Sequence, residues 1–265
     1  MALDLDGTLV DFDDTARPLV VDAVQAVRDS GVHVVLATGR SVFGILPVID
    51  AFGLTDGYGV ASNGAVTFTY HPTTVRTAIT FDPEPAVRAV LDHVPDALVA
   101  VEVIGRGYRT NRHFPPGEIN GEIWLETVDE LVREPVTRVI IRDPQSSVDD
   151  FVALAEQLGL HGTNYYVGYT AWLDLAPEGV SKASGLAGIA AELGVDRSDV
   201  LAIGDGRNDL EMLRWAGRGV AMGHAPDVVK QAADAVTASW DDDGVAVELA
   251  AWFDGRIEVR APERR

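Results

Sequence analysis

The sequence contains no cysteine and few cationic residues. The lack of cysteine excludes disulfide bonds and thiol chemistry, and it is typical of a reducing compartment. Lysine and arginine together number 21 against 41 aspartates and glutamates, which gives a formal net charge of −20. A field of that sign opposes nucleic acid and anionic membranes as partners. Any phosphate-binding site in this chain therefore needs a positive potential built from local groups.

Long apolar runs are also missing. No stretch approaches the roughly 20 apolar residues that span a bilayer, and no signal peptide precedes the acidic segment at the N-terminus. We therefore expect a cytoplasmic protein, a monomer or small homo-oligomer, with no nucleic-acid or membrane partner. The 265 residues, 47% of them hydrophobic, are enough for a substantial core in one large domain or two smaller ones.

The first ten residues combine a short apolar run with two closely spaced acids. Asp4 and Asp6 alternate with leucines, and Gly7 and Thr8 follow at once. This order predicts a buried strand that ends in two carboxylates, at the edge where open α/β sheets bind ligands. Two such acids repel each other unless a cation lies between them, although Asp, Gly and Thr also suit an ordinary turn. The few residues before Asp4 suggest a truncated or late start of the chain.

Alternating strand-like and helix-like segments flank a different central region. Both flanks have the rhythm of a doubly wound, mostly parallel α/β sheet. The segments that give this rhythm are helices at 15–29, 41–52 and 181–193 and from 208, and strands at 32–37, 200–203 and 219–221, with another strand reaching 62–64. We therefore predict a Rossmann-like core formed by residues 1–81 and 178–265.

The central region, residues 82–177, reads as an inserted α+β domain. A hairpin at 66–70 and 75–81 leads into it. Short strands and one helix then follow without the parallel rhythm, at 98–104, 108–110, 136–142, 164–168 and 171–175 for the strands and 147–158 for the helix. We expect this insert to pack as a unit of its own.

Two further polar signals begin helices of the predicted core. Thr38, Gly39 and Arg40 follow the second strand and place a hydroxyl and backbone amides where an anion can bind. The same Thr-Gly step is also typical of a helix cap. Lys182 begins another helix, against the helix dipole, so local structure does not explain it. A solvated surface lysine is the alternative.

A third signal follows the strand at 200–203. Asp205, Asn208 and Asp209 lie in a turn that also contains two glycines. A helix cap needs only one of these side chains. Oxygen ligands of this kind suit Mg²⁺, which is hard and completes its shell with water and substrate phosphate.

Taken in order, these signals resemble the four signature motifs of the haloacid dehalogenase (HAD) superfamily: Asp-x-Asp, Thr, Lys and Gly-Asp-x-x-Asn-Asp. The segments Ser-Asn-Gly-Ala at 62–65 and Gly-Val-Ser-Lys at 179–182 further resemble its Cof-type (subfamily IIB) phosphatases. That branch carries an α+β (C2-type) cap domain between the second and third motifs, and the cap sets substrate specificity. The resemblance thus implies a HAD core formed by 1–81 and 178–265 with a cap at 82–177.

The resemblance also implies roles for the motif residues. Asp4 resembles the nucleophile that becomes an aspartyl-phosphate, and Asp6 the general acid and base. Asp4, the main-chain carbonyl of Asp6 and Asp205 resemble the Mg²⁺ ligands. Phosphate-binding roles fall to Thr38, Gly39, Lys182 and Asn208, and supporting roles to Asp209, Arg40 and Asn63.

The expected function is a Mg²⁺-dependent phosphomonoester hydrolase that acts on small phosphorylated metabolites, sugar phosphates first. A phosphomutase or a dedicated glycosyl-phosphate phosphatase remains open, because fold analogy does not separate them. A non-catalytic regulator on the same fold is the third alternative, and the intact motifs argue against it. In the insert, Glu102 and Glu122 have no assignable role. A basic cluster there suits either a second anionic group of the substrate or a charged, solvated hairpin edge: Arg106, Arg109, Arg112 and His113.

Overall fold

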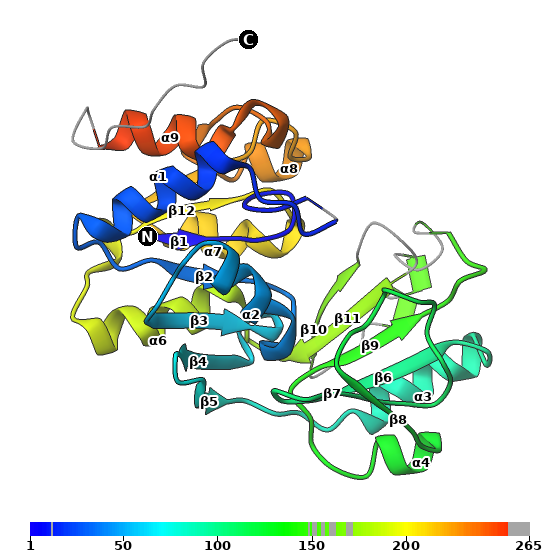
Figure 1. Ribbon diagram of the computed structural model, residues 1–265. Helices are drawn as coiled ribbons and strands as arrows, with labels where there is room; N and C mark the ends of the chain where they lie inside the picture. The colour runs from blue at the N-terminus through cyan, green and yellow to red at the C-terminus, as the bar shows by residue number, and fades with distance from the viewer. Residues whose placement is uncertain are drawn as a thin grey trace.

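The computed structural model describes residues 1–11, 13–147, 149, 153–154, 157–158, 163–167 and 172–253. Two lobes, each built around its own sheet, lie side by side (Figure 1). The N-terminus and the last described helix belong to one lobe, and the middle of the chain forms the other.

In the described part of the chain, the first sheet has eight strands in the order β14-β13-β12-β1-β2-β3-β4-β5. The strands from β14 to β3 are parallel, and β4 and β5 are antiparallel. Their bounds are β1 (Ala2–Leu3), β2 (Val35–Ala37), β3 (Gly57–Ala61), β4 (Val66–Tyr70), β5 (Thr74–Ala78), β12 (Leu201–Gly204), β13 (Arg218–Ala221) and β14 (Ala235–Val236).

Helices cover both faces of this sheet, which explains why its central strands are apolar on both sides. One face packs against α1 (Pro18–Asp29), α2 (Val42–Ala51) and α9 (Gly244–Trp252). The other packs against α6 (Lys182–Leu193), α7 (Leu210–Trp215) and α8 (Asp227–Lys230). Local signals begin two of these helices, since the side chain of Ser41 caps α2 and that of Ser181 caps α6.

Strand β1 lies at the point where the strand order reverses. The chain proceeds from β1 through β2 and β3 in one direction, and from β12 through β13 and β14 in the other. In open α/β sheets the loops at the carboxyl ends diverge at such a point and leave a binding crevice. The loops after β1 and β12 carry Asp4 and Asp205 to this point.

The second sheet has six strands among the described residues, in the order β10-β11-β9-β6-β7-β8. One of its faces is covered by α3 and α4, whose apolar side chains meet Val99, Val101 and their neighbours. The bounds are α3 (Glu84–His93), β6 (Leu98–Val103), β7 (Gly107–Thr110), β8 (Glu122–Leu125), α4 (Val128–Leu131), β9 (Val139–Arg142), β10 (Thr163–Val167) and β11 (Trp172–Pro177).

The opposite face of the second sheet mixes apolar and charged side chains. Ala100, Tyr108 and Ile140 form a small buried cluster there. Glu102 is also buried on this face, because it alternates with Val101 along β6 and lies opposite Tyr108 in the register. This face of the second sheet therefore buries an acidic side chain among apolar ones.

The predicted fold class is confirmed: a mostly parallel, doubly wound sheet carries an inserted α+β unit. The exact boundaries at 81/82 and 177/178 stay a prediction. Four elements were not predicted: α3, α4, β8 and β14. The last three are short or lie at a sheet edge, where periodicity is weak, whereas α3 has an apolar stripe at Ala86, Val87 and Val90 that was overlooked. The helix expected at 147–158 lies largely outside the described residues. In the described residues, every helix is too short or too polar to cross a membrane.

Candidate active site

A fully buried lysine links two of the predicted motifs. Lys182 Nζ lies 2.5 Å from Asp4 Oδ1 and 2.6 Å from Asp209 Oδ1, and none of its side-chain surface is exposed. Burial opposes the charge, but the carboxylates of Asp209 and Asp4 outweigh it and raise the pKa of Lys182. The lysine is therefore an ammonium at neutral pH, placed between two acids, and the solvated-lysine alternative is excluded.

The loop Ser62–Gly64 packs closely against the start of the lysine helix. Gly64 has a φ of +103°, and a Cβ built on it would lie 2.0 Å from the carbonyl oxygen of Ser181. Only glycine permits that approach. The contact fixes the first turn of α6, and with it the direction in which Lys182 enters the site.

Three buried carboxylates meet beside this lysine. Asp4, Asp205 and Asp209 each offer an oxygen within 4.8 Å of the others. Burial, and next the charge of Asp209, raise the pKa of Asp4 well above its ordinary value. Among the described residues of this cluster, three carboxylates face one ammonium, so negative charge is in excess. A hard divalent cation such as Mg²⁺ fits that excess and that set of oxygen donors.

Asp209 serves as a brace for the loop. Its Oδ1 accepts from Lys182, while its Oδ2 accepts from the amides of Asp205 at 3.0 Å and Gly206 at 2.8 Å. Burial raises the pKa of Asp209, and its hydrogen bonds act against that rise. Both oxygens of Asp209 therefore serve the lysine and the loop, and the assignment of the metal to Asp4 and Asp205 stays a prediction.

Asp205 lies against the turn that follows β1. The Thr8 hydroxyl donates to its Oδ1 at 3.4 Å, and a Cβ on Gly7 would come within 2.5 Å of its Oδ2. His224 Nε2 is 3.5 Å from the same Oδ2, and the amide of Trp240 donates to Nδ1 of that ring. Gly7 is therefore needed for the two loops to approach each other.

Asp6 lies apart from the three-carboxylate cluster. Its side chain is 38% exposed, and its carboxylate pairs with Arg40, whose Nη2 also reaches Asp14 Oδ1 at 2.5 Å. Arg40 Nε lies 3.1 Å from both oxygens of Asp6. Of the two acids after β1, Asp4 is thus buried against the lysine and Asp6 is open to an incoming group. The expectation that Asp6 binds metal through its main chain stays a prediction.

A second set of contacts joins the loops after β2, β3 and β12. Asn208 Nδ2 donates to Asn63 Oδ1 at 3.0 Å, and the amide of Asn63 donates to the carbonyl of Thr38 at 3.0 Å. A Cβ on Gly39 would lie 3.1 Å from Asn63 Oδ1, and the hydroxyl of Thr38 accepts from the amide of Arg40. The predicted supporting residue Asn63 is therefore the junction of three loops.

The structure brings every predicted site residue into one of these two connected sets. It adds three that the sequence analysis did not assign: Thr8, Asp14 and His224. Thr8 could have been predicted, since it belongs to the first motif. Asp14 and His224 could not, because only the fold brings them next to the site. Arg207 is exposed.

The basic cluster of the insert is neutralised by neighbouring acids. Ion pairs link Arg106 to Glu122, Arg109 to Glu126 and Arg112 to Asp96. This arrangement favours the interpretation as a charged hairpin edge. Among the lysines and arginines of the described residues, Lys182 and Arg40 form ion pairs with the predicted catalytic acids.

Comparison with known proteins gives consistent matches over nearly the whole chain. The sequence profile of the haloacid dehalogenase-like hydrolases matches residues 1–249. The 5-amino-6-(5-phospho-D-ribitylamino)uracil phosphatase YitU of Bacillus subtilis is 30% identical, covering 96% of this chain and 97% of its own. The phosphoglycolate phosphatase of Natronomonas pharaonis is 32% identical, covering 97% and 98%.

Solved structures agree. A haloacid dehalogenase-like hydrolase from Bacteroides thetaiotaomicron superposes with a TM-score of 0.78 at 26% identity, covering 95% of this chain and 98% of its own. A sugar phosphatase of HAD subclass IIB superposes with a TM-score of 0.78 at 23% identity, covering 96% and 98%, which is a likeness of fold.

Proposed function

This chain belongs to the haloacid dehalogenase-like hydrolases, and from that premise we propose that it is a Mg²⁺-dependent phosphatase of small phosphorylated metabolites, sugar and polyol phosphates first. Its membership in the Cof-type branch was predicted from the motifs and is confirmed, and the chain is a phosphoric monoester hydrolase. The observation that carries the finer proposal is the buried ammonium of Lys182 among three carboxylates.

Asp4 is the nucleophile in this proposal. One of its carboxylate oxygens attacks phosphorus, and the bond from phosphorus to the leaving oxygen breaks, which forms an aspartyl-phosphate. The hydrogen bond from Lys182 to Oδ1 holds the carboxylate in a fixed rotamer. Such fixed geometry lowers the entropic part of the barrier.

Asp6 is the general acid and base in this proposal. Its exposed carboxyl group donates a proton to the leaving oxygen, and the resulting carboxylate then takes a proton from the water that attacks the aspartyl-phosphate. Arg40 contacts both oxygens of Asp6 and so fixes the plane of the carboxyl group. The second step releases inorganic phosphate and restores Asp4 and the protonated Asp6.

Asp4 and Asp205 would hold the metal, together with the main-chain carbonyl of Asp6. When bound, Mg²⁺ supplies the positive charge that lets an anionic nucleophile approach a phosphate dianion. Lys182 adds a permanent positive charge at Asp4 Oδ1, and Asp209 keeps it there. Thr38, Gly39 and Asn208 would bind the remaining phosphate oxygens, and their loops meet at Asn63.

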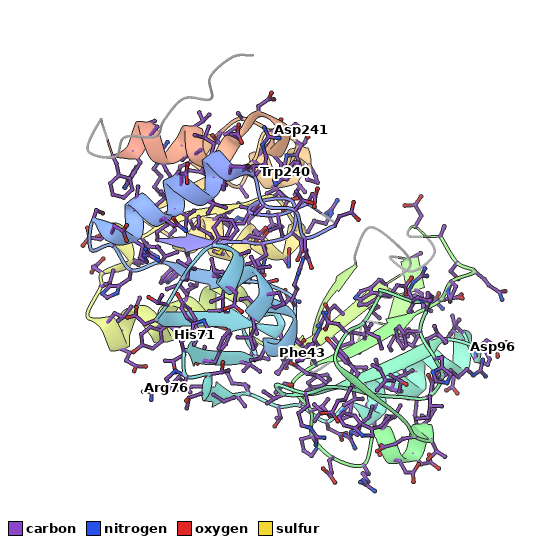
Figure 2. The ribbon with its side chains drawn as sticks, viewed as in Figure 1. Phe43, His71, Arg76, Asp96, Trp240 and Asp241 are labelled. Carbon is purple, nitrogen blue, oxygen red and sulfur yellow. The ribbon has the colours of Figure 1, made fainter. Side chains whose placement is uncertain are left out.

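Charge and architecture support small substrates. A net charge of −20 repels acidic macromolecules at long range, whereas a small dianion can reach a site that Lys182, Arg40 and a bound Mg²⁺ would make locally positive. The second lobe stands beside the loops that carry the site, and Phe43 of α2 lies on the side of the core that faces it (Figure 2). A neighbouring cap of this kind excludes water and contacts the leaving group. Two relatives carry the names of phosphatases for a ribitylamino phosphate and for phosphoglycolate, which are small phosphomonoesters.

Phosphate release from a panel of phosphorylated metabolites tests the proposal, with p-nitrophenyl phosphate as the generic substrate. We expect compact sugar and polyol phosphates to have a far higher kcat/KM than phosphoproteins or nucleic-acid ends. Asp4→Asn on the same panel separates this activity from that of a contaminant. A phosphoprotein hydrolysed as efficiently as the best sugar phosphate would contradict the proposed substrate class. Rearrangement of a sugar phosphate without phosphate release would indicate a mutase.

A further inference from the structure

A buried glutamate of the second lobe hydrogen bonds to a loop of the first. Glu102 Oε2, on β6, accepts from the hydroxyl of Ser62 at 2.6 Å and from that of Thr137 at 3.0 Å. Ser62 is fully buried and Glu102 is 6% exposed, so solvent does not weaken this contact. Thr137 follows Val136, which pairs with Phe81 where the chain passes from one lobe to the other. The contact therefore lies close to the connection between the lobes.

A second contact between the lobes lies beside the first. Tyr108 is the direct cross-strand partner of Glu102, and its hydroxyl lies next to the side chain of Ser41. Arg138 Nη1 donates to the same hydroxyl at 3.0 Å, and Asp174 holds that arginine through two bonds of 2.6 and 2.7 Å. The buried ion pair of Arg138 and Asp174 thus holds the Tyr108 hydroxyl in place beside Glu102.

The two serines reached by this pair lie in the loops after β3 and β2, which carry Asn63 and Thr38. Ser62 precedes Asn63, whose side chain accepts a hydrogen bond from Asn208 in the loop after β12. Ser41 follows Arg40, the partner of Asp6, and its hydroxyl caps α2. Each contact from the second lobe is therefore one residue away from a group of the site.

The loop at Ser62 needs outside support. Ser62 and Asn63 have φ values of +51° and +53°, followed by Gly64 at +103°. The left-handed region is unfavourable for residues other than glycine, and such conformations persist only where the surroundings hold them. The amide of Ser62 is held by the carbonyl of Arg40, and its hydroxyl by Glu102.

We propose that Glu102 and Tyr108 are positioning residues, which hold the loops after β3 and β2 in the conformation in which Asn63, Asn208 and Arg40 serve catalysis. This inference rests on the proposed phosphatase function. It makes the insert part of the catalytic apparatus as well as a cover for the leaving group. Loss of the pair lowers kcat for every substrate, including a generic aryl phosphate, because the displaced groups act on the phosphoryl centre. A residue that contacts only the leaving group would change the ranking of substrates.

The chemistry of Glu102 indicates which replacement preserves the contact. Its Oε1 has no hydrogen-bond partner among the described residues, and burial raises the pKa of this carboxyl group. A buried acid with one unpartnered oxygen is best accommodated in its neutral form. Glutamine has the same shape, and its carbonyl accepts from Ser62 and Thr137 in the same way. Glu102→Gln is thus the conservative variant, and Glu102→Ala removes the contact.

Steady-state kinetics on p-nitrophenyl phosphate and on the best sugar phosphate tests the proposal. We expect Glu102→Ala to lower kcat about 10- to 100-fold on both substrates, since a misplacement of about 1 Å has effects of that size. Glu102→Gln should stay within about threefold of wild type, and Tyr108→Phe should fall between the two. Glu122→Ala, an exposed glutamate of the same sheet, is the matched control and should leave both rates unchanged.

A double-mutant cycle with Ser62→Gly sharpens the test. Glycine adopts the left-handed conformation without strain, so this variant removes the hydroxyl and keeps the loop geometry accessible. Glu102→Ala should have much less effect on kcat in the Ser62→Gly background than in the wild type. Equal effects in both backgrounds would overturn the proposal, as would an Ala variant whose KM or substrate ranking changes while kcat is kept.

Hydrogen exchange tests the inference without any turnover. The Glu102→Ala protein should exchange faster at the amides of 62–65 and 205–209, while the helices α1 and α9 stay as protected as in wild type. Tyr108→Phe gives the same readout where the Ala variant does not fold. Unchanged exchange at both loops would overturn the inference even if the enzyme is a phosphatase. A wild-type protein that releases no phosphate would instead refute the proposed function and leave the exchange result to decide the positioning role.

Discussion

The two lobes each bury a cluster of charges, and the clusters differ in balance. In the second lobe, Arg138 and Asp174 form a two-pronged ion pair, and Glu102, whose pKa is raised by burial, lies beside it. In the first lobe, Lys182 faces three carboxylates, so negative charge is left over. Both clusters are almost completely buried.

The difference in charge balance distinguishes a cluster that stabilises the fold from one that takes part in a reaction. A buried charge without a partner is costly, so a balanced pair is what a fold can keep for positioning. An unbalanced cluster persists where something bound during function completes it. In our proposal the first lobe therefore carries the reaction, and the second lobe positions the loops of the site. Four substitutions and one assay test this difference between the lobes, in order of decreasing effect.

Asp4→Asn should abolish turnover, by about 10⁴-fold or more, because the amide is not a nucleophile toward phosphorus. The folded structure should survive, since the substitution removes one of several mutually repelling buried carboxylates. Phosphate release and the thermal unfolding midpoint, measured on the same preparation, check both statements. Asp13→Asn, at an exposed aspartate of the same loop, is the control and should keep full activity. An active Asp4→Asn protein would remove the nucleophile from the proposal.

Arg138→Met should lower the free energy of unfolding by about 3–5 kcal/mol, because it leaves Asp174 buried without its partner. Urea titration measures the loss. Replacing both members, Arg138→Met with Asp174→Leu, should recover much of the stability, as expected for a balanced pair. Arg112→Met, from the exposed pair with Asp96, should have almost no effect. Equal losses from the buried and the exposed pair would contradict the contrast between the lobes.

Asp205→Asn should weaken metal binding and raise the Mg²⁺ concentration for half-maximal activity by about 10- to 100-fold. Saturating Mg²⁺ should restore part of the rate, which distinguishes a ligand from the nucleophile. The readout is the Mg²⁺ dependence of p-nitrophenyl phosphate hydrolysis in wild type and variant. If the two curves coincide, Asp205 does not hold the metal.

Glu102→Gln should change how stability depends on pH. The pKa of Glu102 is raised in the folded protein above its ordinary value of 4.5, chiefly by burial. Its contribution to stability is thus fully present below pH 4.5 and is lost as the pH rises through the folded value. Glutamine does not titrate, so the variant should gain stability relative to wild type as the pH rises from 4 to 8. Urea midpoints at pH 4 and pH 8 compare the two proteins, and a difference that does not vary with pH would contradict this origin.

Much of the first lobe was predictable from the sequence. Asp4, Thr38 and Asp205 each follow an apolar strand segment, and the ends of neighbouring parallel strands meet at one edge of a sheet. Lys182 was a weaker signal, because a lysine that opposes the dipole of its own helix is also compatible with a solvated surface position. Placement at strand ends indicated that the first three groups meet, whereas the role of Lys182 came from the resemblance to the HAD motifs.

The contacts between the lobes were not predictable in the same way. Ser62 and Glu102 are 40 residues apart and belong to different sheets, so no local pattern links them. Glu102 reads as an ordinary polar position in an alternating strand, and only the fold shows that its face is buried. His224 approaches Asp205 through a loop whose path depends on the whole first sheet. Long-range packing, which periodicity does not encode, decides each of these positions.

The central claim is that the excess of buried carboxylates in the first lobe is completed by a divalent cation during phosphoryl transfer. Hydrolysis of p-nitrophenyl phosphate by metal-free enzyme, prepared with EDTA and then titrated with Mg²⁺, tests it most directly. We predict a rate at background without metal and full recovery as Mg²⁺ is added, with Asp4→Asn inactive throughout. Full activity of the wild-type enzyme in EDTA would contradict the claim.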